Sequence, residues 1–142
     1  MCEAVTSIRF FIPGEPPRTT AQQKGRNSRT GAWYKPPQLL EAEKRYLTFA
    51  RMTRPSAPIV GPVELRVEFR FSRGKHRDGE PKTTRPDTDN MIKLLKDCLT
   101  RAGYWGDDSQ VVLETVAKLW SSDPGVLVEV HPWRGWGRED DK

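Results

Sequence analysis

The chain has 142 residues, the length of one domain that can bury a hydrophobic core without disulfide or metal staples. It carries 24 lysines and arginines against 19 acidic residues, and the resulting net charge of +5 favours polyanionic partners. Cys2 and Cys98 are too few for a disulfide framework or a zinc cluster, and the lack of a membrane-length apolar run or an export leader predicts a cytoplasmic protein with no membrane partner.

The first predicted elements are a strand and a long loop. Residues 5–12 are β-branched and aromatic, which is typical of a strand. Residues 13–37 are proline-rich and basic, with Trp33 and Tyr34 among the cations. Two interpretations are open for this loop. Either the cations bind phosphates while the rings stack on exposed bases, or the loop is solvated and its rings pack on the body.

A helix and a strand are expected next. Residues 38–52 place apolar side chains at helical spacing with charged residues outside them, which predicts a helix. Three prolines and a glycine in residues 54–62 end this pattern. Residues 63–71 then alternate apolar and charged side chains, the period of a strand with one buried face.

A second basic loop, residues 72–84, leads directly into a pair of acidic residues. Cations beside a carboxylate cluster suit a phosphodiester substrate. The candidate DNA-binding residues here are Arg73, Lys75, Arg77, Lys82 and Arg85.

The most distinctive stretch follows. Asp87 and Asp89 precede a predicted helix over residues 90–102, for which Asp89 is the expected N-cap and Gly103 the expected stop. Asp107 and Asp108 come after it. A helix of this length spans about 20 Å, so the two acidic pairs form one site only if the strand that begins at residue 111 runs beside the strand that delivers Asp87.

These acids have two open interpretations. Asp-x-Asp with a distant aspartate is an oxygen-ligand set suited to Mg²⁺. The same residues also suit helix caps and turns. Lys93 shares a helical face with Asp89 and Asn90, although a plain surface lysine is the commoner role at such a position.

Two further strands, residues 111–120 and 126–131, are joined by a turn-rich link that predicts a hairpin. The tail, residues 132–142, is expected to be loosely ordered. We therefore predict one α+β domain over residues 1–142, a mixed sheet with two packed helices in the order β-α-β-α-β-β. No glycine-rich phosphate loop precedes a helix, so no nucleotide cofactor is expected.

The central motifs resemble those of the RusA family of Holliday junction resolvases. The family signature is a basic residue near Asp-x-Asp-Asn, then x-x-Lys, a helix, and an aromatic-x-Asp-Asp-x-Gln-Val segment. Its counterparts here are Arg85, Asp87-Thr88-Asp89-Asn90, Lys93, Asp97 and Gly103-Tyr104-Trp105-Gly106-Asp107-Asp108-Ser109-Gln110-Val111.

The resemblance implies an Mg²⁺-dependent endodeoxyribonuclease, with Mn²⁺ as an expected substitute, acting in recombination and repair. Asp87, Asp89 and Asp108 would bind the metal and Lys93 would assist catalysis, with Asn90 and Asp107 as secondary site residues. The resemblance also implies a homodimer that makes paired cuts in branched, four-way DNA.

Alternatives to this function and the place of the dimer interface remain open. If the chain is not a junction resolvase, it is either a nuclease for other branched or flapped DNA or a non-catalytic DNA-binding protein whose acids only cap a helix. The candidate interfaces are the strand residues Val126, Val128 and Val130, or the face of the helix over residues 38–52.

Overall fold

The computed structural model describes residues 7–18, 25–26 and 28–136. Residues 5 and 6 of the first predicted strand, Cys2 and residues 137–142 of the tail lie outside this range. The main elements are β1 (Ile8–Pro13), α1 (Pro37–Thr53), β4 (Val63–Ser72), α2 (Thr88–Ala102), the short 3₁₀ helix η1 (Asp108–Gln110), β5 (Val111–Ser121) and β6 (Gly125–Pro132). In the described part of the chain, no helix is long and apolar enough to cross a membrane.

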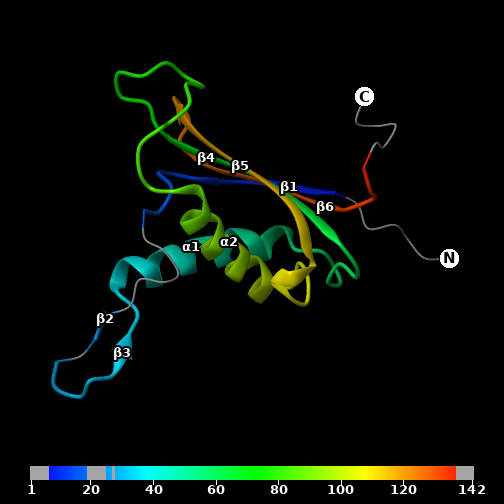
Figure 1. Ribbon diagram of the computed structural model, residues 1–142, viewed down its shortest axis with the longest axis horizontal. Helices are drawn as coiled ribbons and strands as arrows, with labels where there is room; N and C mark the ends of the chain where they lie inside the picture. Colours follow the sequence, from blue (N-terminus) through cyan, green and yellow to red (C-terminus); the bar gives the residue numbers. More distant parts are fainter. Residues whose placement is uncertain (1–6, 19–24, 27, 137–142) are drawn as a thin grey trace.

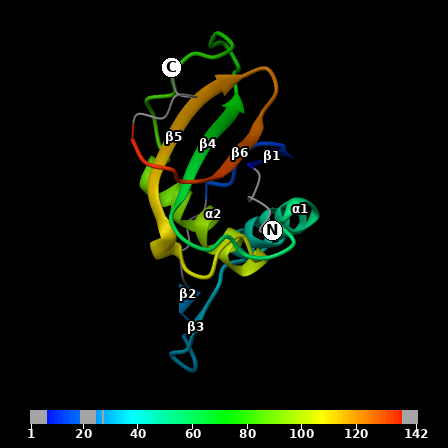
Figure 2. The same ribbon diagram turned by 90° about the vertical axis from the view of Figure 1, so that its right-hand side faces the viewer.

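Four strands form a mixed sheet in the order β1-β6-β4-β5, seen side by side in Figure 2. β4 pairs with β5 in parallel, and the other two pairs are antiparallel. Both helices lie against one face of the sheet (Figure 1). This arrangement confirms the predicted α+β fold and its order of elements.

The predicted hairpin between the last two strands is wrong. β5 and β6 follow one another along the chain, but β4 lies between them and pairs with both. The parallel partner of β4 must be reached by a crossover, and α2 supplies it. The turn-rich link correctly indicated a reversal of the chain, but a local signal does not specify which strand becomes the neighbour.

The core lies between the sheet and the helices. The alternation predicted for β4 is confirmed, because Val63, Leu65, Val67, Phe69 and Phe71 are all buried. Burying each such side chain stabilises the fold by about 1.5–3 kcal/mol. The β6 residues Val126, Val128 and Val130 are 0% exposed in this core, so they do not form a dimer interface.

The ends of α2 are set by local signals. Gly103 has φ 93° and ends the helix, with its N–H and that of Tyr104 donating to the carbonyls of Thr100 and Leu99. This confirms Gly103 as the stop. The N-cap is Asp87 and not Asp89, which lies within the first turn.

The first basic segment contains a small ribbon that was predicted only as loop. Its strands are β2 (Gly25–Arg26) and β3 (Trp33–Tyr34), and Figure 1 shows the ribbon standing away from the body. Trp33 is 66% and Tyr34 53% exposed, so both rings are largely open to solvent and the interpretation in which they are buried against the body is wrong.

Candidate functional site

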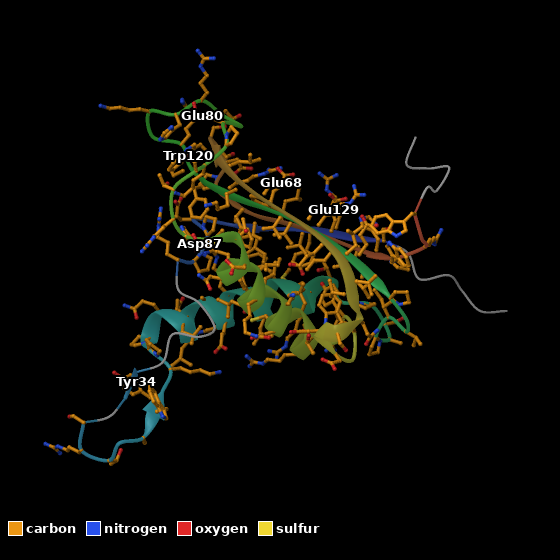
Figure 3. All side chains as sticks on the ribbon, in the orientation of Figure 1. Tyr34, Glu68, Glu80, Asp87, Trp120 and Glu129 are labelled. Carbon is orange, nitrogen blue, oxygen red and sulfur yellow. The ribbon has the colours of Figure 1, made fainter. Side chains whose placement is uncertain are left out.

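Asp87 and Asp89 lie where the second basic loop enters α2. Asp87 occupies the N-cap position with extended backbone, yet within the described residues its carboxylate makes no capping hydrogen bond. Both aspartates are exposed, and Figure 3 shows Asp87 at the start of the helix. The positive end of the helix dipole favours negative charge at this place. Capping therefore does not account for the Asp87 carboxylate.

Asp107, unlike Asp87, caps a helix with its side chain. It is the N-cap of η1, and its side chain accepts from the N–H of Ser109. The Gln110 carboxamide accepts in return from the N–H groups of Gly106 (2.7 Å) and Asp107 (3.2 Å). This reciprocal capping box matches the turn interpretation for Asp107.

Asp108 lies beside the second half of α2. Its carboxylate accepts a short hydrogen bond from the hydroxyl of Thr100 and a longer one, 3.4 Å, from the indole of Trp105. Asp97 is its neighbour. Burial raises the pKa of Asp97, and the hydrogen bond to Asp108 and the charge of Asp108 raise it further, while Lys93 opposes the shift.

The sequence indicates Asp97 only through the family signature, and the structure places it beside Asp108. Arg101, four residues later, is paired with Glu43 of α1 (3.5 Å). Asp89, Lys93 and Asp97 follow one another at steps of four residues, which puts them on one face of α2. This face leads from the first acidic pair towards Asp108.

One chain does not bring the three predicted metal ligands together. Asp87 and Thr100, which contacts Asp108, are separated by about 20 Å of helical rise. Among the residues described, no three His, Cys, Asp or Glu side chains are grouped closely enough to hold a metal ion.

The sheet topology explains this separation. The strand after Asp108 does run beside β4, as expected, but in parallel. Parallel strands start at the same end of a sheet, so Asp108, which precedes β5, lies at the opposite end from the loop that leaves β4 and delivers Asp87.

The predicted DNA-binding residues fall into two groups. Arg73, Lys75, Arg77 and Arg85 are exposed. Lys82 is 4% exposed, with its ammonium 4.4 Å from the ring centre of Trp120. Burial lowers the pKa of Lys82, and the charges of Arg18 and Lys118 lower it further. The structure thus places Lys82 inside the protein and not on its surface.

Both histidines have partners that the sequence did not reveal. His76 stacks on Trp120 at 4.1 Å between ring centres and contacts Glu80, and His131 contacts Ser7 and Glu129. Figure 3 shows Glu80 and Trp120 together in the basic loop region. The contacts of His76 hold the second basic loop on β5, and the contact of His131 with Ser7 joins β6 to the residue before β1.

Comparison with known proteins connects this arrangement to a family. The model of the family "Endodeoxyribonuclease RusA" matches residues 13–131. YqaN of Bacillus subtilis, an uncharacterized protein, is 34% identical over 138 residues, which covers 87% of this chain and 94% of YqaN.

Two shorter matches are to proteins with a named activity. The crossover junction endodeoxyribonuclease of Lactococcus phage r1t is 36% identical over 70 residues, 49% of this chain and 53% of its own. Crossover junction endodeoxyribonuclease RusA of Escherichia coli K12 is 40% identical over 58 residues, 41% of each chain. Since the family model spans most of the chain, this protein belongs to the RusA family of endodeoxyribonucleases and is a nuclease.

Proposed function

We propose that this nuclease is a metal-dependent, structure-specific enzyme that resolves four-way DNA junctions by paired cuts. The observation that carries the proposal is the pair of exposed carboxylates at the start of α2, of which Asp87 occupies the N-cap without capping. An exposed basic loop adjoins this pair. The names of the phage and E. coli relatives support the choice of a crossover junction as substrate.

The side chains fit a hard divalent cation. Asp87, Asp89 and Asp108 offer oxygen atoms only, the donors that Mg²⁺ prefers, and Mn²⁺ accepts the same ligands. When bound, such an ion lowers the pKa of a coordinated water and offsets charge on the leaving oxygen. The exposed position of Asp87 and Asp89 leaves their carboxylates accessible to solvent, metal and DNA.

A second copy of the chain completes the site in this proposal. The acids lie at two ends of one helix, so two protomers with antiparallel α2 helices would place Asp87 and Asp89 of one chain near the partner's Asp108. A two-fold axis then creates two equivalent sites. Two sites are what paired cuts in a four-way junction need.

The remaining residues have roles on DNA. Lys93, exposed on the helix face between the two acidic groups, adds positive charge near the reacting phosphate, where negative charge grows in the transition state. Asn90 orients the site. Arg73, Lys75, Arg77 and Arg85 bind backbone phosphates.

The test is cleavage of four-way, flapped and linear DNA of equal length, with Mg²⁺ or with chelator. The proposal expects symmetric paired cuts in the four-way substrate, only with metal. Preferred cutting of flaps would instead identify a nuclease for other branched DNA. Binding without any cutting, in the presence of either Mg²⁺ or Mn²⁺, would identify a non-catalytic binder and defeat the proposal.

A further inference from the structure

We infer that Lys118 is a positioning residue, which holds the turn carrying Asp87 in place by hydrogen bonding to the carbonyls that precede it. The inference rests on the proposed function, because it assigns Lys118 to the geometry of the proposed metal ligands. Lys118 belongs to β5, outside the motif that resembles the family signature.

The contacts converge on one short stretch of backbone. The ammonium of Lys118 donates to the carbonyl oxygens of Thr84 (2.7 Å) and Pro86 (2.8 Å). Arg18 donates to the carbonyl between them, that of Arg85 (3.4 Å). Three successive carbonyls ahead of Asp87 therefore each accept from a cationic side chain. Bonds from charged donors are stronger than neutral ones.

The donor itself is held by the sheet. Lys118 lies opposite Phe69 of β4, on the side of the sheet that faces the helices. The backbone carbonyl of Lys118 accepts from the N–H of Lys82 (2.9 Å), and the N–H of Trp120 donates to the backbone carbonyl of Glu80 (2.8 Å). Residues 80–82, which precede the turn that carries Asp87 (the acidic turn), are thus hydrogen-bonded along the edge of β5. A site residue supported by a rigid element keeps its geometry better than one on an unsupported loop.

Lys82 strengthens the same stretch from inside. Its buried ammonium lies over the rings of Trp120 (4.4 Å) and Phe71 (5.1 Å) and donates to the hydroxyl of Thr84. Thr84 is consequently held through its carbonyl by one lysine and through its hydroxyl by another. The two lysines define where the turn begins.

β5 also offers a matched control. Glu114 lies on the same side of β5 as Lys118 and pairs with Lys96 in the middle of α2 (3.0 Å). This ion pair also joins β5 to the α2 region, but it does not contact the acidic turn. Lys96→Met therefore removes one link between β5 and α2 and leaves the carbonyl contacts of Lys118 intact.

The experiment measures Mn²⁺ binding to the full-length protein by calorimetry, without DNA, for Lys118→Met, Lys118→Arg and Lys96→Met. Supporting residues of metal ligands typically change affinity 10- to 100-fold, so Lys118→Met should raise the Kd for Mn²⁺ by about tenfold or more. Lys118→Arg should restore most of the affinity, because a guanidinium can donate to two carbonyls. Lys96→Met should stay within about twofold of the wild type.

Equal Mn²⁺ affinity in Lys118→Met and the wild type would overturn the inference, as would an equal loss in Lys96→Met. If Lys118→Met does not fold, Arg18→Met is measured in its place. A Kd for Mn²⁺ raised by about two- to threefold supports the positioning of the turn, and an unchanged Kd overturns it. The Asp87→Asn variant distinguishes a failure of the proposed function from a failure of the positioning role of Lys118. If Asp87→Asn binds Mn²⁺ and cuts junctions like the wild type, the proposed function fails, and if only the Lys118 variants lack an effect, the positioning role alone fails.

Discussion

At the scale of single residues, two aspartates with similar sequence contexts have different roles. Asp87 and Asp107 both occupy an N-cap position, but only Asp107 uses its side chain to cap. A carboxylate that caps a helix is engaged in a hydrogen bond to backbone. One that does not is available to a metal ion or to solvent. This contrast separates the candidate metal ligand from the turn residue.

Replacing Asp87, Asp89 or Asp108 singly with Asn should lower junction cutting by about a hundredfold or more, because a neutral amide is a poorer ligand for Mg²⁺. Binding of the junction should persist or tighten, as repulsion of phosphate falls. Asp107→Asn is the control and should be milder. Cleavage rates and gel-shift affinities check this, and full activity in any of the first three variants would refute the ligand assignment.

Lys93→Ala should lower turnover by about 100-fold with little change in junction affinity, because its proposed role is in the transition state. Single-turnover cleavage at saturating enzyme separates rate from binding. Lys44→Ala on α1, also an exposed helical lysine, serves as the control. Equal losses of affinity and rate would make Lys93 an ordinary phosphate contact.

At the scale of elements, the second basic loop combines anchored and exposed residues. His76, Glu80 and Lys82 contact one another or Trp120 and anchor the loop on β5. Its arginines and Lys75 remain at the surface. The loop therefore presents its outer cations from a supported backbone, which suits the phosphate-binding role proposed for them.

Neutralising Arg73, Lys75 and Arg77 together should flatten the salt dependence of junction binding. Each lost phosphate contact reduces the slope of log K against log salt by roughly 0.9. Neutralising Lys44, Arg51 and Arg54, which are exposed on and after α1, removes the same charge elsewhere. Affinities measured over a range of salt concentrations test this. Equal slopes in the loop variant and the wild type would mean that the loop does not contact DNA.

At the scale of the whole molecule, the parallel pairing of β4 and β5 separates the acids. The loop after β4 delivers Asp87, and the residues before β5 include Asp108, so the two lie at opposite ends of the sheet. A site that needs both must draw on two chains. The proposed homodimer is thus tied to catalysis as well as to the symmetry of the junction.

Complementation tests this arrangement. Asp89→Asn and Asp108→Asn should each be inactive alone, but their heterodimer, purified through two different tags, should nick one strand of a junction, because it retains one intact site. A heterodimer of Asp87→Asn with Asp89→Asn should stay inactive as the control. The wild type should sediment near twice 16.3 kDa. An inactive Asp89→Asn and Asp108→Asn pair would mean that each site lies within one chain.

The sequence by itself determined the helices and the main strands, because their signals are local. Gly103 ends α2 where predicted, and the alternation in residues 63–71 marks the buried face of β4. The acidic motif and the basic loop beside it could also be recognised from the sequence, since both are runs of neighbouring residues.

Tertiary structure alone decided the rest, because it depends on residues far apart in the chain. The place of β6 beside β4 and the burial of Lys82 under Trp120 depend on contacts between segments far apart in the chain, and the contact of Asp108 with Thr100 depends on how the turn after α2 folds back. Lys118 showed nothing in its sequence context that links it to the acidic turn. The sheet brings its ammonium to the carbonyls of Thr84 and Pro86, 34 and 32 residues away, and only packing in three dimensions creates that contact.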